Sequence, residues 1–223
     1  MFIVNSYALA IIFCFITMLC WGSWGNTQKL AGKTWRYELF YWDYVIGVLL
    51  LSLIFAFTLG SFGEGGRSFL ADLRQADAGN IGSAFLGGII FNASNILLSA
   101  AIAIAGMSVA FPVGVGLALV LGVIINYLGS QKGDPLFLFL GVGLITLAII
   151  LNALAYRKAS AGNMKVTTKG IMIAIISGVL MSMFYRFVAA SMDLDNFVSP
   201  AQGKMTPYTA TVIFALGVFI SNF

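Results

Sequence analysis

Long apolar stretches separated by short polar segments run along the whole chain. Residues 78–131 contain no Asp, Glu, Lys or Arg. As a helix this stretch would measure about 80 Å at about 1.5 Å per residue, whereas the hydrocarbon core of a bilayer is about 30 Å thick. It must therefore cross a membrane twice, and the glycine and proline at Gly106 and Pro112 predict a turn near them.

The other charge-free stretches extend this pattern to seven predicted membrane-spanning helices. Their ranges are 7–24, 39–59, 81–104, 107–128, 136–156, 171–191 and 209 onward. The last stretch is still apolar at Phe223 after about 15 residues, fewer than the roughly 20 that a crossing needs. We therefore expect a truncated chain.

Composition supports the membrane assignment. Hydrophobic residues make up 60% of the chain and charged residues only 9%, which is too little polar cover for a soluble domain. The segments of roughly ten residues with alternating polarity that are typical of a membrane barrel do not appear. The sequence therefore predicts an all-α integral membrane protein, a bundle of transmembrane helices.

Basic residues in the loops predict the orientation. The loops after the first, third and fifth spans hold seven Lys and Arg residues, and the loops on the other side hold four. Because cytoplasmic loops carry an excess of Lys and Arg, we expect the odd-numbered loops in the cytoplasm and the amino terminus outside the cell.

The chain has no histidine, which excludes imidazole metal sites and Ser-His or Cys-His nucleophiles. Two Gly-Val-Gly sequences do not complete a GxGxxG nucleotide loop. No metal or cofactor is expected. Gly114, Ala118 and Gly122 are instead spaced as small residues on one helix face, which predicts close packing against a neighbouring helix.

Polar residues inside apolar spans are the candidates for function. Asn92 and Asn95 lie three residues apart and Ser99 follows four residues later, so the three share one helix face that should point inward. They could hydrogen-bond a polar solute, or they could join two helices. The sequence does not separate these alternatives.

Charged residues near the ends of two spans are further candidates. Glu38 and Asp43 lie at the start of the second span, and without histidine a carboxylate would have to carry a coupled proton, with Asp43 the first candidate. The alternative for Asp43 is a salt bridge to Lys33 or Arg36. Arg186, about 16 residues into the sixth span, could bind solute or extend to the membrane surface.

The first basic loop is flanked by all four tryptophans, which are typical of membrane interfaces. The segment 20–26 is also polar and interrupted by glycine, and unwound helix ends expose backbone groups to substrates in transporters. Trp21, Ser23 and Asn26 are therefore candidates for the transport pathway.

Several short motifs together resemble the ureide permeases, within the drug/metabolite transporter superfamily. They are Gly87-Gly88, Ser94-Asn95-Ile96, Gly106-Met107-Ser108-Val109, Asn126-Tyr127, the residues Tyr185, Phe187 and Val188, and Lys204-Met205-Thr206-Pro207-Tyr208. The resemblance adds Tyr185 to the candidate substrate-binding residues. It departs from the plant members at 157–169, which is short and lacks their phosphate-binding-like motif.

The resemblance implies ten helices in two inverted five-helix repeats, of which about seven helices are present here. Residues 1–156 would be the first repeat, 157–169 a basic cytoplasmic loop and 170–223 the first two helices of the second repeat. The implied function is secondary active transport of a ureide, nucleobase or related amide in the plasma or inner membrane. A co-transported proton or cation would be a further partner.

Two alternatives stay open at this point. The related glucose/ribose porters and rhamnose symporters share the implied architecture, so a sugar could be the solute. An intramembrane enzyme acting on lipids would use Asp43 and Arg186, although no cluster of carboxylates supports it. We expect no enzyme and no nucleic-acid partner.

Overall fold

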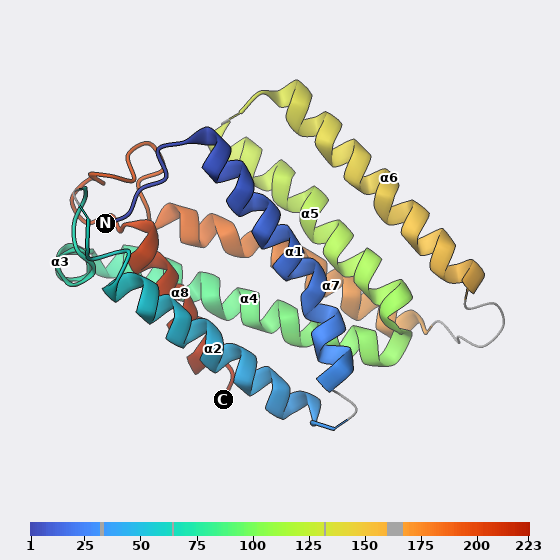
Figure 1. Ribbon diagram of the computed structural model, residues 1–223. Helices are drawn as coiled ribbons and strands as arrows, with labels where there is room; N and C mark the ends of the chain where they lie inside the picture. The colour runs from blue at the N-terminus through green and yellow to red at the C-terminus, as the bar shows by residue number, and fades with distance from the viewer. Residues whose placement is uncertain (32–33, 64, 132, 160–166) are drawn as a thin grey trace. The chain divides into compact units, whose positions relative to one another are not determined.

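The computed structural model describes residues 1–31, 34–63, 65–131, 133–159 and 167–223, and within them the chain is helical (Figure 1). The helices are α1 (Tyr7–Ala31), α2 (Tyr37–Phe57), α3 (Phe69–Gln75), α4 (Ala78–Ala105), α5 (Met107–Ser130), α6 (Pro135–Ala159), α7 (Thr168–Ala190) and α8 (Pro207–Ile220).

The predicted spans are confirmed as helices. Among the described residues, six helices are long and apolar enough to cross a membrane, namely α1, α2, α4, α5, α6 and α7. Helix α8 is apolar but shorter, at 14 residues. The protein is therefore an all-helical, multi-pass membrane protein.

The turn between the third and fourth spans consists of one residue. Gly106 separates α4 from α5 with a φ of 80°, a backbone conformation that glycine adopts without steric cost. Pro112 lies inside α5 and takes no part in the turn. The sequence also missed α3, because its seven residues include Asp72 and Arg74 and read as a polar loop.

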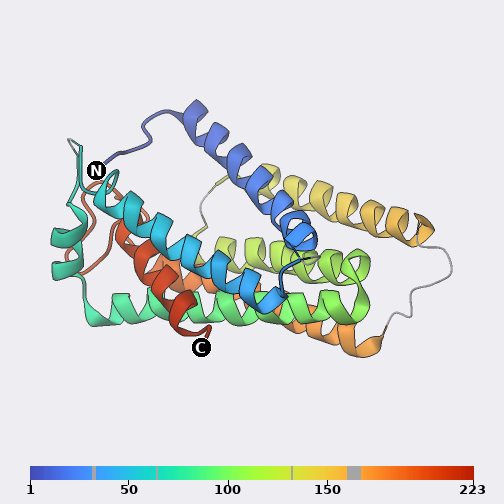
Figure 2. The same cartoon turned by 60° about the horizontal axis from the view of Figure 1, so that its bottom comes forward.

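The chain forms two compact units. The first consists of Met1–Ile81 and Met192–Phe223, and the second of Gly82–Ser191. In the first unit α2 and α8 pack against each other (Figure 2). Ala56, Phe69 and Val212 form a buried cluster there. In the second unit α5 packs along both α6 and α7 (Figure 1).

Small residues bring α5 and α7 into close contact, as the sequence predicts. A Cβ atom added at Gly178 of α7 would lie 2.6 Å from the Gly114 carbonyl oxygen and 3.1 Å from Leu117 Cβ. A Cβ at Gly114 would lie 3.3 Å from the Ala174 carbonyl oxygen. Close backbone approach through small residues is a main source of helix association in lipid, so this contact stabilises the second unit.

We predict that Gly178→Ala lowers the melting temperature of the detergent-solubilised protein. The added methyl group meets backbone atoms, and overpacking of this kind costs about 1 to 3 kcal/mol. Gly122→Ala is the matched control, because its nearest contact would be an ordinary 3.8 Å to Ser182. Equal melting temperatures for the two variants would contradict the close packing of α5 and α7.

Candidate functional site

Helix α4 carries polar side chains on two faces, and the first face joins it to α7. The Ser94 hydroxyl donates to the Ser177 carbonyl oxygen at 2.8 Å, and the Ser177 hydroxyl donates to the Ser94 carbonyl oxygen at 2.9 Å. Both serines are buried. This reciprocal pair satisfies both hydroxyls and holds α4 against α7.

The second face contains the predicted residues Asn92, Asn95 and Ser99. At about 100° per residue, all three lie about 100° to 160° around the helix from Ser94. They are nearly completely buried, with exposed fractions of 1%, 2% and 6%. The structure therefore brings these three residues onto one buried face, distinct from the face that meets α7.

One of these three side chains has unused hydrogen-bonding capacity among the described residues. The buried Ser99 hydroxyl oxygen has no hydrogen-bond partner. The buried Asn95 amide on the same face offers an acceptor oxygen and two N–H donors. A buried polar group left without a partner costs about 1 to 3 kcal/mol, so this face is suited to a polar ligand.

Tyr185 and Arg186 are exposed on α7. The Tyr185 ring packs edge-on against the Phe184 ring, with the ring centroids 6.5 Å apart. The Phe184 ring packs against the Phe91 ring of α4, with the centroids 5.1 Å apart. Arg186 lies four residues before the end of α7, about 6 Å along the helix axis. That short distance suits a guanidinium that extends to the membrane surface.

Trp21, Ser23 and Asn26 are exposed on α1. The glycine-broken helix end suggested by the sequence is wrong, because α1 continues without interruption to Ala31. The Ser23 hydroxyl donates to the Cys20 carbonyl oxygen at 3.1 Å, and the Thr27 hydroxyl donates to the Ser23 carbonyl oxygen at 3.1 Å. These polar side chains bond to their own helix and no backbone group is released.

Asp43 is exposed on α2 and has an unexpected partner. The Trp35 indole Nε1–H donates to Asp43 Oδ2 at 3.0 Å. Trp35 therefore fixes one carboxylate oxygen, which the sequence did not predict. The side chain of Glu38 and the whole of Lys33 lie outside the described residues.

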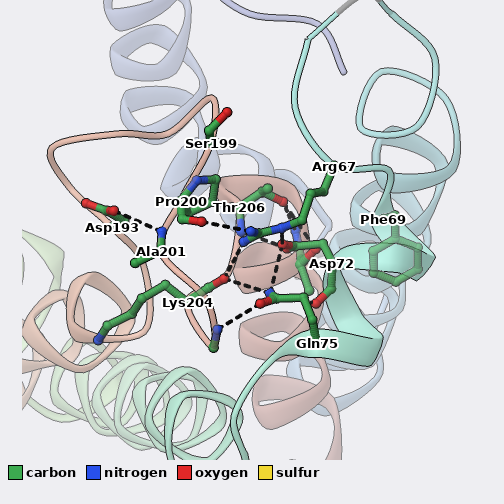
Figure 3. A network of polar contacts seen from close by, with 12 residues as sticks. Arg67, Phe69, Asp72, Gln75, Asp193, Ser199, Pro200, Ala201, Lys204 and Thr206 are labelled. Carbon is green, nitrogen blue, oxygen red and sulfur yellow. Dashed lines mark hydrogen bonds and ion pairs between the residues drawn. The ribbon is translucent and has the colours of Figure 1, made fainter.

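Sequence reasoning missed a polar network in the first unit, shown in Figure 3. Arg67 forms a salt bridge of 2.8 Å with Asp72, whose side chain is fully buried. Asp72 in turn accepts a hydrogen bond from the backbone N–H of Thr206 at 2.7 Å. The motif 204–208 was the signal in the sequence that could have revealed this network. It contains the Lys204 carbonyl oxygen and the Thr206 N–H, to which Arg67 and Asp72 bond.

Comparisons of the sequence with known proteins identify a family. A model of the ureide permease family matches residues 40–169. Ureide permease 1 of Arabidopsis thaliana is 27% identical over 165 residues, which cover 73% of this chain and 42% of that protein. Ureide permease 4 of Arabidopsis thaliana is 28% identical over 176 residues, covering 77% and 44%.

A relative from another plant gives the same result. Probable ureide permease A3 of Vigna unguiculata is 28% identical over 168 residues, which cover 73% of this chain and 45% of that protein. The chain thus spans less than half the length of these curated relatives. No solved structure gives a significant match. With the family model covering more than half of its residues, the chain belongs to the ureide permease family.

Proposed function

We propose that this protein is a secondary transporter that carries a ureide or a related small amide across the membrane by alternating access. The observation that carries the proposal is the buried face of α4, on which the Ser99 hydroxyl has no hydrogen-bond partner among the described residues and the Asn95 amide lies beside it. Membership of the ureide permease family supports the solute class. The ten-helix, inverted-repeat architecture is part of the same proposal.

The chemistry of this face suits a ureide. A ureide is a planar group with carbonyl acceptors and N–H donors side by side. An asparagine amide presents the complementary pair, one carbonyl oxygen and an NH₂ group, and a serine hydroxyl both donates and accepts. Asn95 and Ser99, with Asn92 beside them, could therefore form hydrogen bonds of both polarities with one solute.

The competing interpretation is that these residues only join helices. In this structure the contact between α4 and α7 is made by Ser94 and Ser177, whose hydroxyls each donate to the carbonyl oxygen of the other residue. A face that joined helices would use its donors in the same way. The unused hydroxyl of Ser99, next to the Asn95 amide on the same face, favours solute binding.

We also propose that Asp43, with Glu38, carries the coupled proton or cation. Asp43 is a carboxylate within a helix long and apolar enough to span the membrane, and such ionisable residues typically take part in ion pathways. Its exposure leaves one carboxylate oxygen accessible while Trp35 orients the other. Trp21, Ser23, Asn26, Tyr185 and Arg186 remain predicted pathway residues.

Replacing Asn95 by Leu should weaken solute binding without preventing folding. The change removes the hydrogen-bonding groups and keeps a similar volume, so the apparent KM for uptake of a radiolabelled ureide such as allantoin into proteoliposomes should rise about tenfold, equivalent to about 1.4 kcal/mol. The melting temperature should stay close to that of the unmodified protein.

The matched control is Ser94→Ala on the neighbouring face. It removes the hydroxyl that bonds to Ser177, so the melting temperature should fall while KM is unchanged. A lower melting temperature and an unchanged KM for Asn95→Leu would remove this residue from the solute site. Failure of the full-length protein, with both proposed repeats, to take up any ureide would overturn the proposed function itself.

Asp43→Asn should abolish uptake driven by a proton gradient and leave exchange of solute across the membrane intact. The amide oxygen of the new side chain can still accept from Trp35, so the local geometry is kept while the titrating group is lost. Trp35→Phe is the control that removes the donor and keeps the carboxylate. Gradient-driven accumulation by Asp43→Asn would exclude this residue as the proton carrier.

Orientation can be tested with single cysteines at exposed positions outside the membrane-spanning helices, after Cys14 and Cys20 are replaced by Ala. Ser199→Cys should react with a membrane-impermeant thiol reagent in intact cells, because the positive-inside rule predicts its loop outside. Thr167→Cys should react only after permeabilisation. The reverse pattern would place the amino terminus in the cytoplasm.

A further inference from the structure

A polar network within the first unit joins two segments that are far apart in sequence. One segment contains Arg67 and α3, and the other is the loop 192–206 that leads into α8 (Figure 3). We call the network the clasp and define it by its residues. They are Arg67, Asp72, Gln75, Asn80, Pro200, Gly203, Lys204 and Thr206.

Arg67 bonds to both segments at once. Its Nε donates to Asp72 Oδ1 at 2.8 Å, while Nη1 donates to the Pro200 carbonyl oxygen at 2.7 Å and Nη2 to the Lys204 carbonyl oxygen at 2.8 Å. A guanidinium holds its donors in one rigid plane, so these bonds fix the two segments in one relative position. A lysine at this position could not reproduce that geometry.

Asp72 links the clasp to the first turn of α8. Its Oδ2 accepts from the backbone N–H of Thr206 at 2.7 Å, and Thr206 is the N-cap residue directly before Pro207 at the start of that helix. The Thr206 hydroxyl also accepts from the backbone N–H of Thr209. The buried carboxylate thereby sets where α8 begins.

Gln75 and Asn80 close the other side of the clasp around Gly203. Gln75 Oε1 accepts from the Gly203 N–H at 2.8 Å, and Asn80 Nδ2 donates to the Gly203 carbonyl oxygen at 2.8 Å. Gly203 has a φ of 84°, and a Cβ atom there would overlap the Asp77 carboxylate. The N–H and the carbonyl oxygen of Gly203 are therefore both bonded by side chains, one at the end of α3 and the other near the start of α4.

We propose that the clasp stays closed throughout transport, so that α2, α3 and α8 move as one rigid body. Opening it would leave the fully buried Asp72 carboxylate without Arg67 and would break several hydrogen bonds together, and uncompensated buried charges are strongly destabilising. Helix α8 packs against both α2 and α3, so the clasp and the apolar contacts hold the same elements. This inference rests on the proposed transport function.

A disulfide across the same two segments tests whether they separate. In a background with Cys14 and Cys20 replaced by Ala, Gly65→Cys is combined with Val198→Cys, because a Cβ at position 65 would lie 3.8 Å from Val198 Cγ1, where the cysteine sulfur would be. In a disulfide each Cβ lies about 3.0 Å from the partner's sulfur, so a shift of about 1 Å between the two segments lets the bond form. The tip of the Ile3 side chain, which also lies near this Cβ, can turn aside.

Oxidation of the double cysteine variant in proteoliposomes should leave the rate of ureide uptake unchanged. The two single cysteine variants, treated with the same oxidant, are the controls, and mass spectrometry measures the cross-linked fraction. Loss of uptake on oxidation, with recovery after a reducing agent, would show that the segments separate and would overturn the proposal.

Amide hydrogen exchange supplies a readout that does not depend on uptake. The Gly203 and Thr206 amides should exchange slowly with and without allantoin, and Arg67→Lys should accelerate both by at least about tenfold and lower the melting temperature. Rapid exchange in the unmodified protein, or exchange accelerated by the solute, would overturn the clasp. Slow exchange in a protein that takes up no ureide would overturn the transport function alone.

Discussion

In a bilayer, a polar group without a partner in the protein has no water to bond, and this constraint governs the structure. Each buried hydroxyl, amide or carboxylate must bond within the protein or to something that the protein binds. Ser94 and Ser177 meet this requirement through each other. The buried Ser99 hydroxyl has no such partner among the described residues, and the proposed solute site follows from that difference.

The same constraint separates the two kinds of polar cluster in this protein. In the clasp, the fully buried Asp72 carboxylate accepts from Arg67, Gln75 and the Thr206 backbone. A network with its donors and acceptors paired gains nothing from a ligand and is rigid. On the buried face of α4 the donors and acceptors are incompletely used. The first arrangement suits a fixed element of a transporter, and the second suits a binding surface.

The membrane-spanning helices could be predicted from the sequence because lipid imposes a simple rule on them. A charge-free stretch such as 78–131 cannot be exposed to water over its length and must span. The contact between Gly114 and α7 was predictable for a related reason, since small residues four apart permit close packing. Outside the spans the rule no longer applies, and α3 was missed because its charged residues read as a loop.

Side-chain partners were predicted less well because they depend on residues that are distant in sequence. The sequence analysis weighed a proton-carrying role and a salt bridge for Asp43, and did not foresee that its carboxylate accepts from the indole of Trp35. Arg67 bonds to carbonyl oxygens more than 130 positions away, and no local pattern reveals that. The segment 20–26 stayed helical because one glycine costs a helix only about 1 kcal/mol.

The motifs that resemble the ureide permeases have structural roles in this protein. Gly87 has no side chain, so the Val188 side chain can pack against its backbone. Ser94 forms a hydrogen bond to Ser177, and Thr206 is the N-cap residue of α8. Such residues preserve the packing that related proteins share, so family membership follows from them while the choice of solute does not. Asn95 immediately follows Ser94 in the same motif and points to the other face of α4. The residues that fix the fold and those that select the solute are therefore adjacent in sequence, and only the helix geometry separates them.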